Sequence, residues 1–227
     1  MSRSIAALLS LALLSLTAAA PPETKFSPEI AHFAELDTAT PPKPCGFLFT
    51  GSSSVRFWKT LDQDMAPYPV INRGFGGSQI ADVNLYFDQV VTRYHPRAIF
   101  FYAGENDLWA AKKTPAQVTA DFATFMALKD KRLGKTKVYF ITLKPSKQRF
   151  TQLAEQGEVN DAVRAMATKR SDLAVVDVVP TMLENGQPKD IFVGDGLHMT
   201  PAGYALWTAV VRPVVEQEAK TGAACKG

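Results

Sequence analysis

Short apolar runs alternate with longer amphipathic stretches along most of this chain, and this alternation restricts the folds open to it. The runs have the length of strands buried on both faces, and the stretches have the length of helices. The runs cover Phe47–Thr50, Val70–Asn72, Ala98–Tyr102, Val138–Thr142 and Ala174–Val178, and the stretches cover Ser54–Asp64, Ile80–Tyr94, Thr114–Leu128, Gln152–Lys169 and Pro201–Lys220. The pattern predicts an α/β fold, a three-layer α/β/α sandwich with a five-stranded parallel sheet.

Polar loops follow the first three apolar runs. Parallel sheets bind ligands at the carboxyl ends of their strands, so the residues after each run are the candidates for chemistry. The loops are Gly51-Ser52-Ser53-Ser54, Asn72–Ser78 and Ala103–Asp107. Taken singly, each also fits a helix cap or an ordinary turn. The serine loop lacks the second glycine of a Gly-x-Ser-x-Gly elbow and the lysine of a phosphate-binding loop.

One of the three histidines, His198, stands three residues after Asp195. A carboxylate that orients an imidazole supplies two of the three parts of a nucleophilic hydrolase site. Thr200-Pro201 follows directly, and a hydroxyl cap followed by proline is typical of a helix start. We therefore expect this pair in a loop held at the start of a helix.

Together, these motifs resemble the conserved blocks of the SGNH hydrolases, also called the GDSL esterase/lipase family, from about Phe47 to Tyr204. The resemblance implies that Ser53 is the nucleophile and that Asp195 and His198 complete a catalytic triad. It also implies the flavodoxin-like architecture of that family. Because three serines are consecutive, Ser54 is the fallback nucleophile.

The resemblance also implies an oxyanion hole, formed by the N–H groups of Ser53 and Gly77 and the side-chain amide of Asn106. Ser52 and Ser78 stand where the family often has aspartate. Neither of those aspartates is the nucleophile, so the two departures concern the geometry of the loops more than the activity.

The function implied by the resemblance is hydrolysis of small or short-acyl carboxylic esters through an acyl-enzyme. Similar family members include acetylhydrolases of the platelet-activating-factor type and carbohydrate deacetylases, so the expected substrate is an acylated sugar or a lipid-derived ester. The mechanism requires no metal or organic cofactor. Two alternatives stay open: a catalytically inactive binding protein on the same fold, and a carbohydrate O-acyltransferase.

Several further residues lie near the motifs. Trp58 and Trp109 follow the first and third motifs, so either can line the substrate pocket or simply pack in the core. Asp107, next to the oxyanion asparagine, is expected to hold its loop. His95 precedes a strand, at the wrong end of the sheet for catalysis, and is expected to be structural.

Residues 1–20 differ from the rest of the chain. Arg3 precedes an apolar stretch from Ile5 to Leu16, and small residues follow at positions 17–20. This order predicts a signal peptide over residues 1–19, with cleavage near Ala19 or Ala20, and an exported protein that is periplasmic or secreted. The alternative is a buried or membrane-anchoring helix. No stable membrane span is expected once the signal is removed.

The rest of the chain is expected to form one domain. A proline-rich extension over residues 20–45, with a short helix near Pro28 to Leu36, precedes a hydrolase domain over residues 46–220 and a tail over residues 221–227. In an oxidising compartment, Cys45 and Cys225 can pair and join the two ends of the domain. Two unpaired thiols are the alternative, and no second cysteine or histidine stands at the spacing of metal ligands.

The charge balance is nearly even, with 25 Lys and Arg against 22 Asp and Glu. There is no stripe of basic and aromatic residues, so we expect no nucleic-acid partner. The basic segment from Lys129 to Lys137 is typical of a solvated helix end and turn. The sequence does not indicate an oligomeric state.

Overall fold

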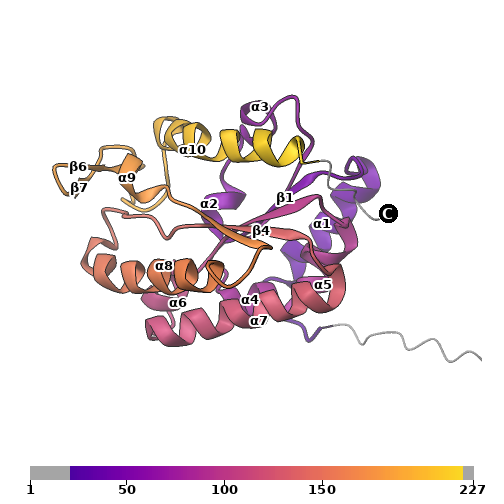
Figure 1. The fold of residues 1–227 in the computed structure, drawn as a ribbon, viewed down its shortest axis with the longest axis horizontal. Coiled ribbons are helices and arrows are strands. Elements are labelled where there is room, and N and C mark those ends of the chain that lie inside the picture. The colour runs from indigo at the N-terminus through magenta and orange to yellow at the C-terminus, as the bar shows by residue number, and fades with distance from the viewer. Residues whose placement is uncertain (1–20, 222–227) are drawn as a thin grey trace, which may run out of the picture.

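Five short strands form one parallel sheet in the computed structural model, which describes residues 21–221 (Figure 1). The strands are β1 (Phe47–Gly51), β2 (Val70–Gly74), β3 (Ala98–Tyr102), β4 (Lys137–Ile141) and β5 (Leu173–Val176). Their order across the sheet is β2-β1-β3-β4-β5. The chain moves outward from β1 in one direction to β2 and in the other to β3, so the order reverses between β1 and β3. This is the doubly wound, flavodoxin-like order.

Helices cover both faces of the sheet, which confirms the predicted three-layer sandwich. One face carries α1 (Ser27–Ala39), α4 (Ile80–Leu85), α5 (Phe87–Val90), α7 (Pro115–Leu133) and α8 (Leu153–Ala167), and the other carries α2 (Ser53–Arg56), α3 (Leu61–Asp64), α9 (Val179–Met182) and α10 (Pro201–Ala219) (Figure 1). The shorter elements are η1 (Thr92–Tyr94), α6 (Glu105–Trp109), η2 (Phe150–Gln152) and a two-stranded hairpin of β6 (Leu183–Glu184) and β7 (Gln187–Pro188).

Successive side chains along each strand face opposite sides of the sheet and so contribute to two separate hydrophobic cores. In β1, Leu48 faces the core under α7 and α8, whereas Phe47 and Phe49 face the core under α10. In β3, Phe101 faces the core under α7 and α8, and Phe100 faces the core under α10. Because both faces are buried, the strands are apolar throughout rather than alternating with polar residues.

Two predicted helices are wrong as single helices. The stretch from Ser54 to Asp64 is divided into α2 and α3, because side chains hold an irregular turn between them. The carboxylate of Asp64 accepts hydrogen bonds from the indole N–H of Trp58 at 2.6 Å and from the hydroxyl of Thr60 at 2.7 Å. These bonds favour the turn over a continued helix.

The predicted helix from Ile80 to Tyr94 is divided into α4, α5 and η1. Tyr86 lies between α4 and α5, and Val91 lies between α5 and η1 with a φ of −129°. Consecutive β-branched residues at positions 90–92 weaken the helix at this point.

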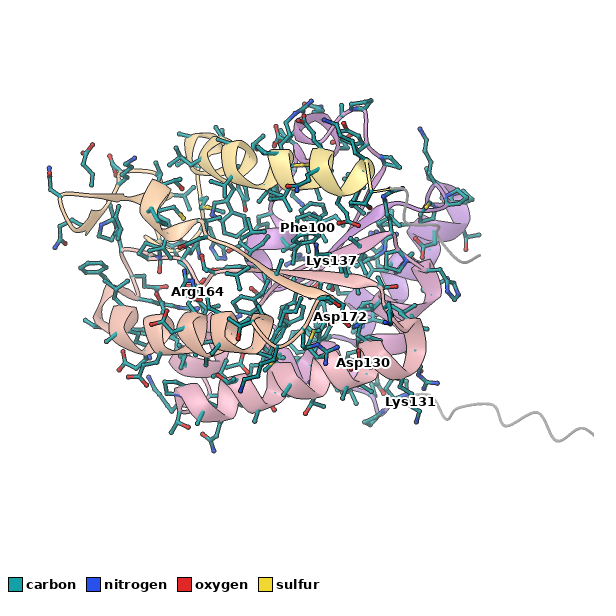
Figure 2. All side chains as sticks on the ribbon, in the orientation of Figure 1. Phe100, Asp130, Lys131, Lys137, Arg164 and Asp172 are labelled. Atoms are coloured by element: carbon teal, nitrogen blue, oxygen red, sulfur yellow. The ribbon has the colours of Figure 1, made fainter. Side chains whose placement is uncertain are left out.

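The end of α7 is pinned to the start of β5 by a buried lysine. Lys129 has no exposed surface, forms ion pairs with Asp172 and with Asp130, and donates to the carbonyl of Gly134 at 2.9 Å. Figure 2 shows Asp130 and Asp172 near each other between α7 and β5. The expectation of a wholly solvated basic segment is therefore wrong at Lys129, whose charge is balanced by carboxylates.

Several predictions concern residues that lie outside the described part of the chain. These include the signal peptide over residues 1–19 and the cysteine at position 225. The pairing of Cys45, which stands two residues before β1, with Cys225 therefore stays a prediction. Within residues 21–221, no helix is both long and apolar enough to cross a membrane. The predicted short helix in the extension is confirmed as α1.

We expect Trp207→Ala to lower the free energy of unfolding by about 3–5 kcal/mol, because it empties the centre of the core under α10. Trp207 is fully buried, and its ring centroid lies 4.9 Å from that of Tyr102 and 5.7 Å from that of Trp58. Urea denaturation measures the change, with Leu36→Ala, at a position 44% exposed, as the control. A loss below about 1 kcal/mol for Trp207→Ala would contradict this packing.

Candidate active site

A close backbone contact between β1 and β3 sets the position of Ser53. Gly51 ends β1 with a φ of +124°, and a Cβ there would lie 1.9 Å from the carbonyl oxygen of Tyr102, so only glycine fits. The N–H of Ser52 donates to that same carbonyl at 2.8 Å. The chain then turns, and Ser53 is the first residue of α2, at the carboxyl edge of the sheet.

The side chains of Ser53, His198 and Asp195 form one hydrogen-bonded path. The Oγ of Ser53 lies 3.0 Å from His198 Nε2, and His198 Nδ1 lies 2.5 Å from Asp195 Oδ2. An ionised carboxylate can only accept, so Nδ1 carries the proton. The lone pair of Nε2 therefore faces the hydroxyl of Ser53, which is the arrangement of a general base beside a nucleophile.

Asp195 is held in its ionised form by its own loop. Partial burial raises its pKa, but the N–H groups of His198 and Leu197, at 2.9 and 2.8 Å from Oδ1, and the imidazole lower the pKa to about 2. The Asp195 side chain is 43% exposed and that of His198 is 26% exposed, so the pair lies in an open site.

The loop that carries this pair is fixed at both ends. The N–H of Val193 donates to the carbonyl of His198 at 2.8 Å, and that of Gln148 donates to Gly196 at 3.0 Å. The Thr200 hydroxyl caps α10, whose first residue is Pro201. The helix start that the sequence predicts is confirmed, and it immobilises the chain two residues after the imidazole.

The candidate oxyanion residues come from the loops after β2 and β3. Gly77 has a φ of +76° and no atom near its missing side chain, so its backbone borders open space. The amide nitrogen of Asn106 donates to the carbonyl of Ser78 at 3.0 Å. The hydroxyl of Ser78 in turn bonds to the carbonyl of Gly51 at 3.1 Å, which joins all three loops.

The three consecutive serines have different environments. Ser52 and Ser54 are buried, with 4% and 2% exposed. The carbonyl of Ser54 accepts a hydrogen bond from the hydroxyl of Tyr204, which anchors α2 to α10. Ser53 is partly exposed and is the serine whose hydroxyl contacts His198, so the geometry favours it over the fallback.

The two tryptophans considered for the substrate pocket differ in burial. Trp58 is 1% exposed and packs against Phe49, Tyr204 and Trp207, so of the two expected roles it has the one in the core and not the one in the substrate pocket. Its ring is large enough to bridge the short helices to α10, and burial there removes it from solvent. Trp109 is half-buried at the end of α6, and its role at the site stays a prediction.

Two of the other residues singled out in the sequence, Asp107 and His95, differ in burial and position. Asp107 is fully buried, accepts from the N–H of Ile80 at 3.1 Å and forms an ion pair with Lys113 at 2.9 Å. It therefore holds the β2 and β3 loops together, as expected. His95 is exposed in a left-handed turn just before β3, at the opposite end of the sheet from Ser53.

Sequence reasoning missed an aromatic neighbour of the imidazole. Phe57, 36% exposed, packs edge-on against His198 with 4.9 Å between ring centroids. Its place just after the serine loop is the only signal for it in the sequence.

A buried charged cluster beneath the site was also missed. Lys144 follows β4 and pairs with Glu105 at 2.7 Å, while the hydroxyl of Tyr102 donates to the same carboxylate. Burial lowers the pKa of Lys144 and raises that of Tyr102 well above its usual range. The rule that pointed to the first three loops also applies to the residues after β4, and it could have found this lysine.

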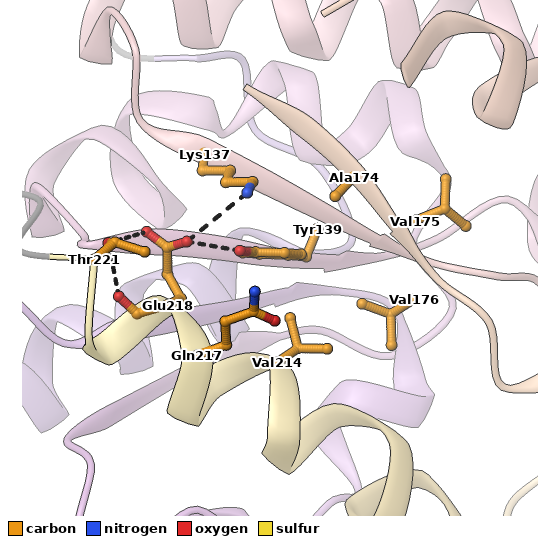
Figure 3. A pocket seen from close by; sticks show the side chains of 9 residues that line it. All are labelled: Lys137, Tyr139, Ala174, Val175, Val176, Val214, Gln217, Glu218 and Thr221. Carbon is orange, nitrogen blue, oxygen red and sulfur yellow. Dashed lines mark hydrogen bonds and ion pairs between the residues drawn. The ribbon is translucent and has the colours of Figure 1, made fainter. Parts of the chain in front are cut away.

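A hollow of about 250 Å³ lies elsewhere, between β5 and the last turns of α10 (Figure 3). Its polar lining includes Tyr139, whose hydroxyl donates to Glu218 at 2.7 Å, and Lys137. Its lining runs along β5 from Ala174 to Val176 and includes Lys137, the first residue of β4. It contains none of the residues that surround Ser53.

The model of the GDSL-like lipase/acylhydrolase family matches residues 41–206. No curated protein sequence matches the chain.

Solved structures share the fold at low sequence identity. A GDSL-like lipase from Bacteroides thetaiotaomicron has a TM-score of 0.70 and 19% identity, covering 83% of this chain and 97% of that one. The lipase/acylhydrolase from Enterococcus faecalis has a TM-score of 0.65 and 19% identity, covering 80% and 99%. A carbohydrate esterase of family 3 from Talaromyces cellulolyticus has a TM-score of 0.61 and 14% identity, covering 76% and 97%.

We expect the carboxyl group of Asp195 to titrate near pH 2. Because this pKa lies below the usual value of about 3.9, ionised Asp195 stabilises the folded loop above about pH 4, and that contribution is lost as the pH falls toward 2. Carboxyl ¹³C shifts measured against pH report the midpoint. In His198→Ala the midpoint should rise, because one hydrogen bond and one opposing charge are removed. A midpoint near 3.9 in the unmodified protein would contradict the described loop.

Proposed function

Because the chain belongs to the GDSL-like lipase/acylhydrolase family, whose members hydrolyse carboxylic esters, we propose that it is an exported serine esterase that acts through Ser53, His198 and Asp195. The observation that carries this proposal is the continuous path from Ser53 Oγ through the imidazole to the carboxylate. Ser53 lies near the start of the domain sequence, and Asp195 and His198 lie near its end. A purely structural role would not require their side chains to be hydrogen-bonded to one another.

In the proposed reaction, Ser53 Oγ attacks the ester carbonyl carbon while its proton passes to His198 Nε2. The ionised carboxylate of Asp195 keeps Nδ1 protonated and stabilises the imidazolium that forms. The imidazolium then donates its proton to the alcohol oxygen as the ester C–O bond breaks. The alcohol leaves, and the acyl group stays on Ser53.

The carbonyl oxygen carries negative charge in both tetrahedral intermediates. The N–H groups of Ser53 and Gly77 and the amide N–H of Asn106 are proposed to bind it; losing one such donor typically lowers kcat about 10²–10³-fold. Water, activated by His198, then attacks the acyl carbon and releases the carboxylic acid, which returns Ser53 to its starting state.

Small or short-acyl esters are the substrate class that suits this site. His198 and Asp195 are open to solvent, and partly exposed Phe57 stands beside the imidazole. A long acyl chain requires an extended apolar channel, because its burial drives binding. The open setting of the triad supports a substrate held by its ester group and its immediate neighbours.

Labelling with a fluorophosphonate probe tests the nucleophile. We expect one equivalent of probe on Ser53, found by peptide mapping, no labelling of Ser53→Ala, and strongly slowed labelling of His198→Ala. Ser54→Ala is the matched control: it removes the neighbouring hydroxyl, which is buried, and should label normally. Folded protein that takes up no probe would instead favour an inactive binding protein.

Hydrolysis of nitrophenyl esters of increasing chain length tests the substrate class. We expect kcat/KM to be highest for acetyl or butyryl esters and to fall for longer chains. A preference for long chains would contradict the proposed class. Acyl transfer to an added sugar that is faster than hydrolysis would favour an O-acyltransferase.

Export is supported by the composition of residues 1–20 and is tested on the mature protein. We expect a protein recovered outside the cytoplasm whose first residue is Ala20 or Pro21, because small residues precede the cleavage site. The same sample should show no titratable thiol if Cys45 and Cys225 are paired. An intact Met1 on protein retained in the cytoplasm would contradict export.

A further inference from the structure

The side-chain amide of Asn106 is held on both of its polar atoms. Its Oδ1 accepts a hydrogen bond from Nη2 of Arg149 at 2.9 Å, and its Nδ2 donates to the carbonyl of Ser78 at 3.0 Å. An asparagine Nδ2 carries two hydrogens, so one remains after the bond to Ser78. These two contacts define which end of the amide is oxygen and which is nitrogen.

Arg149 is an unusual residue to find at this position. It lies in the loop between β4 and α8 and is 6% exposed. Within residues 21–221, no carboxylate forms an ion pair with it, and its Nε is buried without a hydrogen-bond partner. Burial of a cation without a counterion costs free energy, so stability gives no reason for an arginine here.

The positive charge of Arg149 acts on two neighbouring side chains. Its guanidinium lies 5.8 Å from the ring centroid of Trp109, and its charge contributes to the lowered pKa of Lys144, mainly a result of burial. The two buried carboxylates next to Asn106 in sequence have other cations as partners: Glu105 pairs with Lys144 through Oε2, and Asp107 pairs with Lys113. The guanidinium is therefore directed to the amide of Asn106 rather than to an acid.

We propose that Arg149 is a positioning residue for the oxyanion hole, acting through Asn106; this inference rests on the proposed function. The torsion that rotates an asparagine amide is soft, so the amide can turn its oxygen into the hole. A bond from Arg149 to Oδ1 prevents that rotation and keeps the remaining Nδ2–H available to the oxyanion. The cation also polarises the amide and strengthens Nδ2–H as a donor.

The geometry calls for arginine rather than lysine. A planar guanidinium can present Nη2 to Oδ1 while its Cζ lies 5.8 Å from the ring centroid of Trp109, whereas a lysine ammonium is a compact, strongly hydrated point charge. Arg149→Lys should therefore fold and keep the charge but recover only part of the effect.

Steady-state kinetics on an acetyl ester test the proposal. We expect Arg149→Ala to lower kcat about 10–100-fold with KM within about threefold, because the oxyanion exists only in the transition state and intermediates. Arg149→Lys should be intermediate, and added guanidinium should restore part of the activity of Arg149→Ala. Arg132→Met, which removes a half-exposed arginine of α7, is the control and should match the unmodified protein.

A double-mutant cycle separates action through Asn106 from any other effect. If Arg149 works by orienting the amide, Asn106→Ala with Arg149→Ala should be no slower than Asn106→Ala alone. Independent, multiplicative losses would overturn the inference, and so would unchanged kcat in folded Arg149→Ala or Arg149→Lys. Circular dichroism establishes folding for each variant. Retained activity in Ser53→Ala would overturn the proposed function instead, so the two failures are distinct.

Discussion

The arrangement of the site depends on the close contact between the ends of β1 and β3. The two strands remain paired up to Gly51 and Tyr102, where there is no room for a side chain. The order of strands across the sheet reverses between β1 and β3. The loops that follow these two strands therefore lie on either side of the reversal. Ligands of such sheets bind at this reversal, and Ser53 and Asn106 are the first functional side chains after β1 and β3.

Polar groups in the loops after β1, β2, β3 and β4 form contacts with one another. Ser78 and Asp107 tie the β2 and β3 loops to the rest of the edge, and the Glu105–Lys144 pair joins the loops after β3 and β4. Such a network is costly unless its members are satisfied, but it fixes backbone positions within narrow limits. A site that must hold donors at the position of a developing charge benefits from that rigidity.

Much of this could be predicted from the sequence. The five apolar runs located every strand of the parallel sheet but not the short β6–β7 hairpin. The carboxyl-end rule pointed to the loops, and the resemblance to the family's motifs selected Ser53, Asp195 and His198, which meet in the structure. The helix breaks near Trp58 and Val91 could not be predicted, because they depend on side-chain contacts and local strain that leave the amphipathic pattern unchanged. Arg149 was missed for a different reason: its partner is 43 residues away, and only the packed loops bring the two together.

A crystal structure of the protein after reaction with a phosphonate ester tests the central claim most directly, since the adduct imitates the tetrahedral intermediate. The account predicts a bond from phosphorus to Ser53 Oγ, with the phosphoryl oxygen about 2.7–3.1 Å from the backbone nitrogens of Ser53 and Gly77 and from Asn106 Nδ2. His198 Nε2 should lie within hydrogen-bond reach of Ser53 Oγ or of the leaving-group oxygen. A phosphoryl oxygen directed into solvent, or an adduct on another residue, would contradict it.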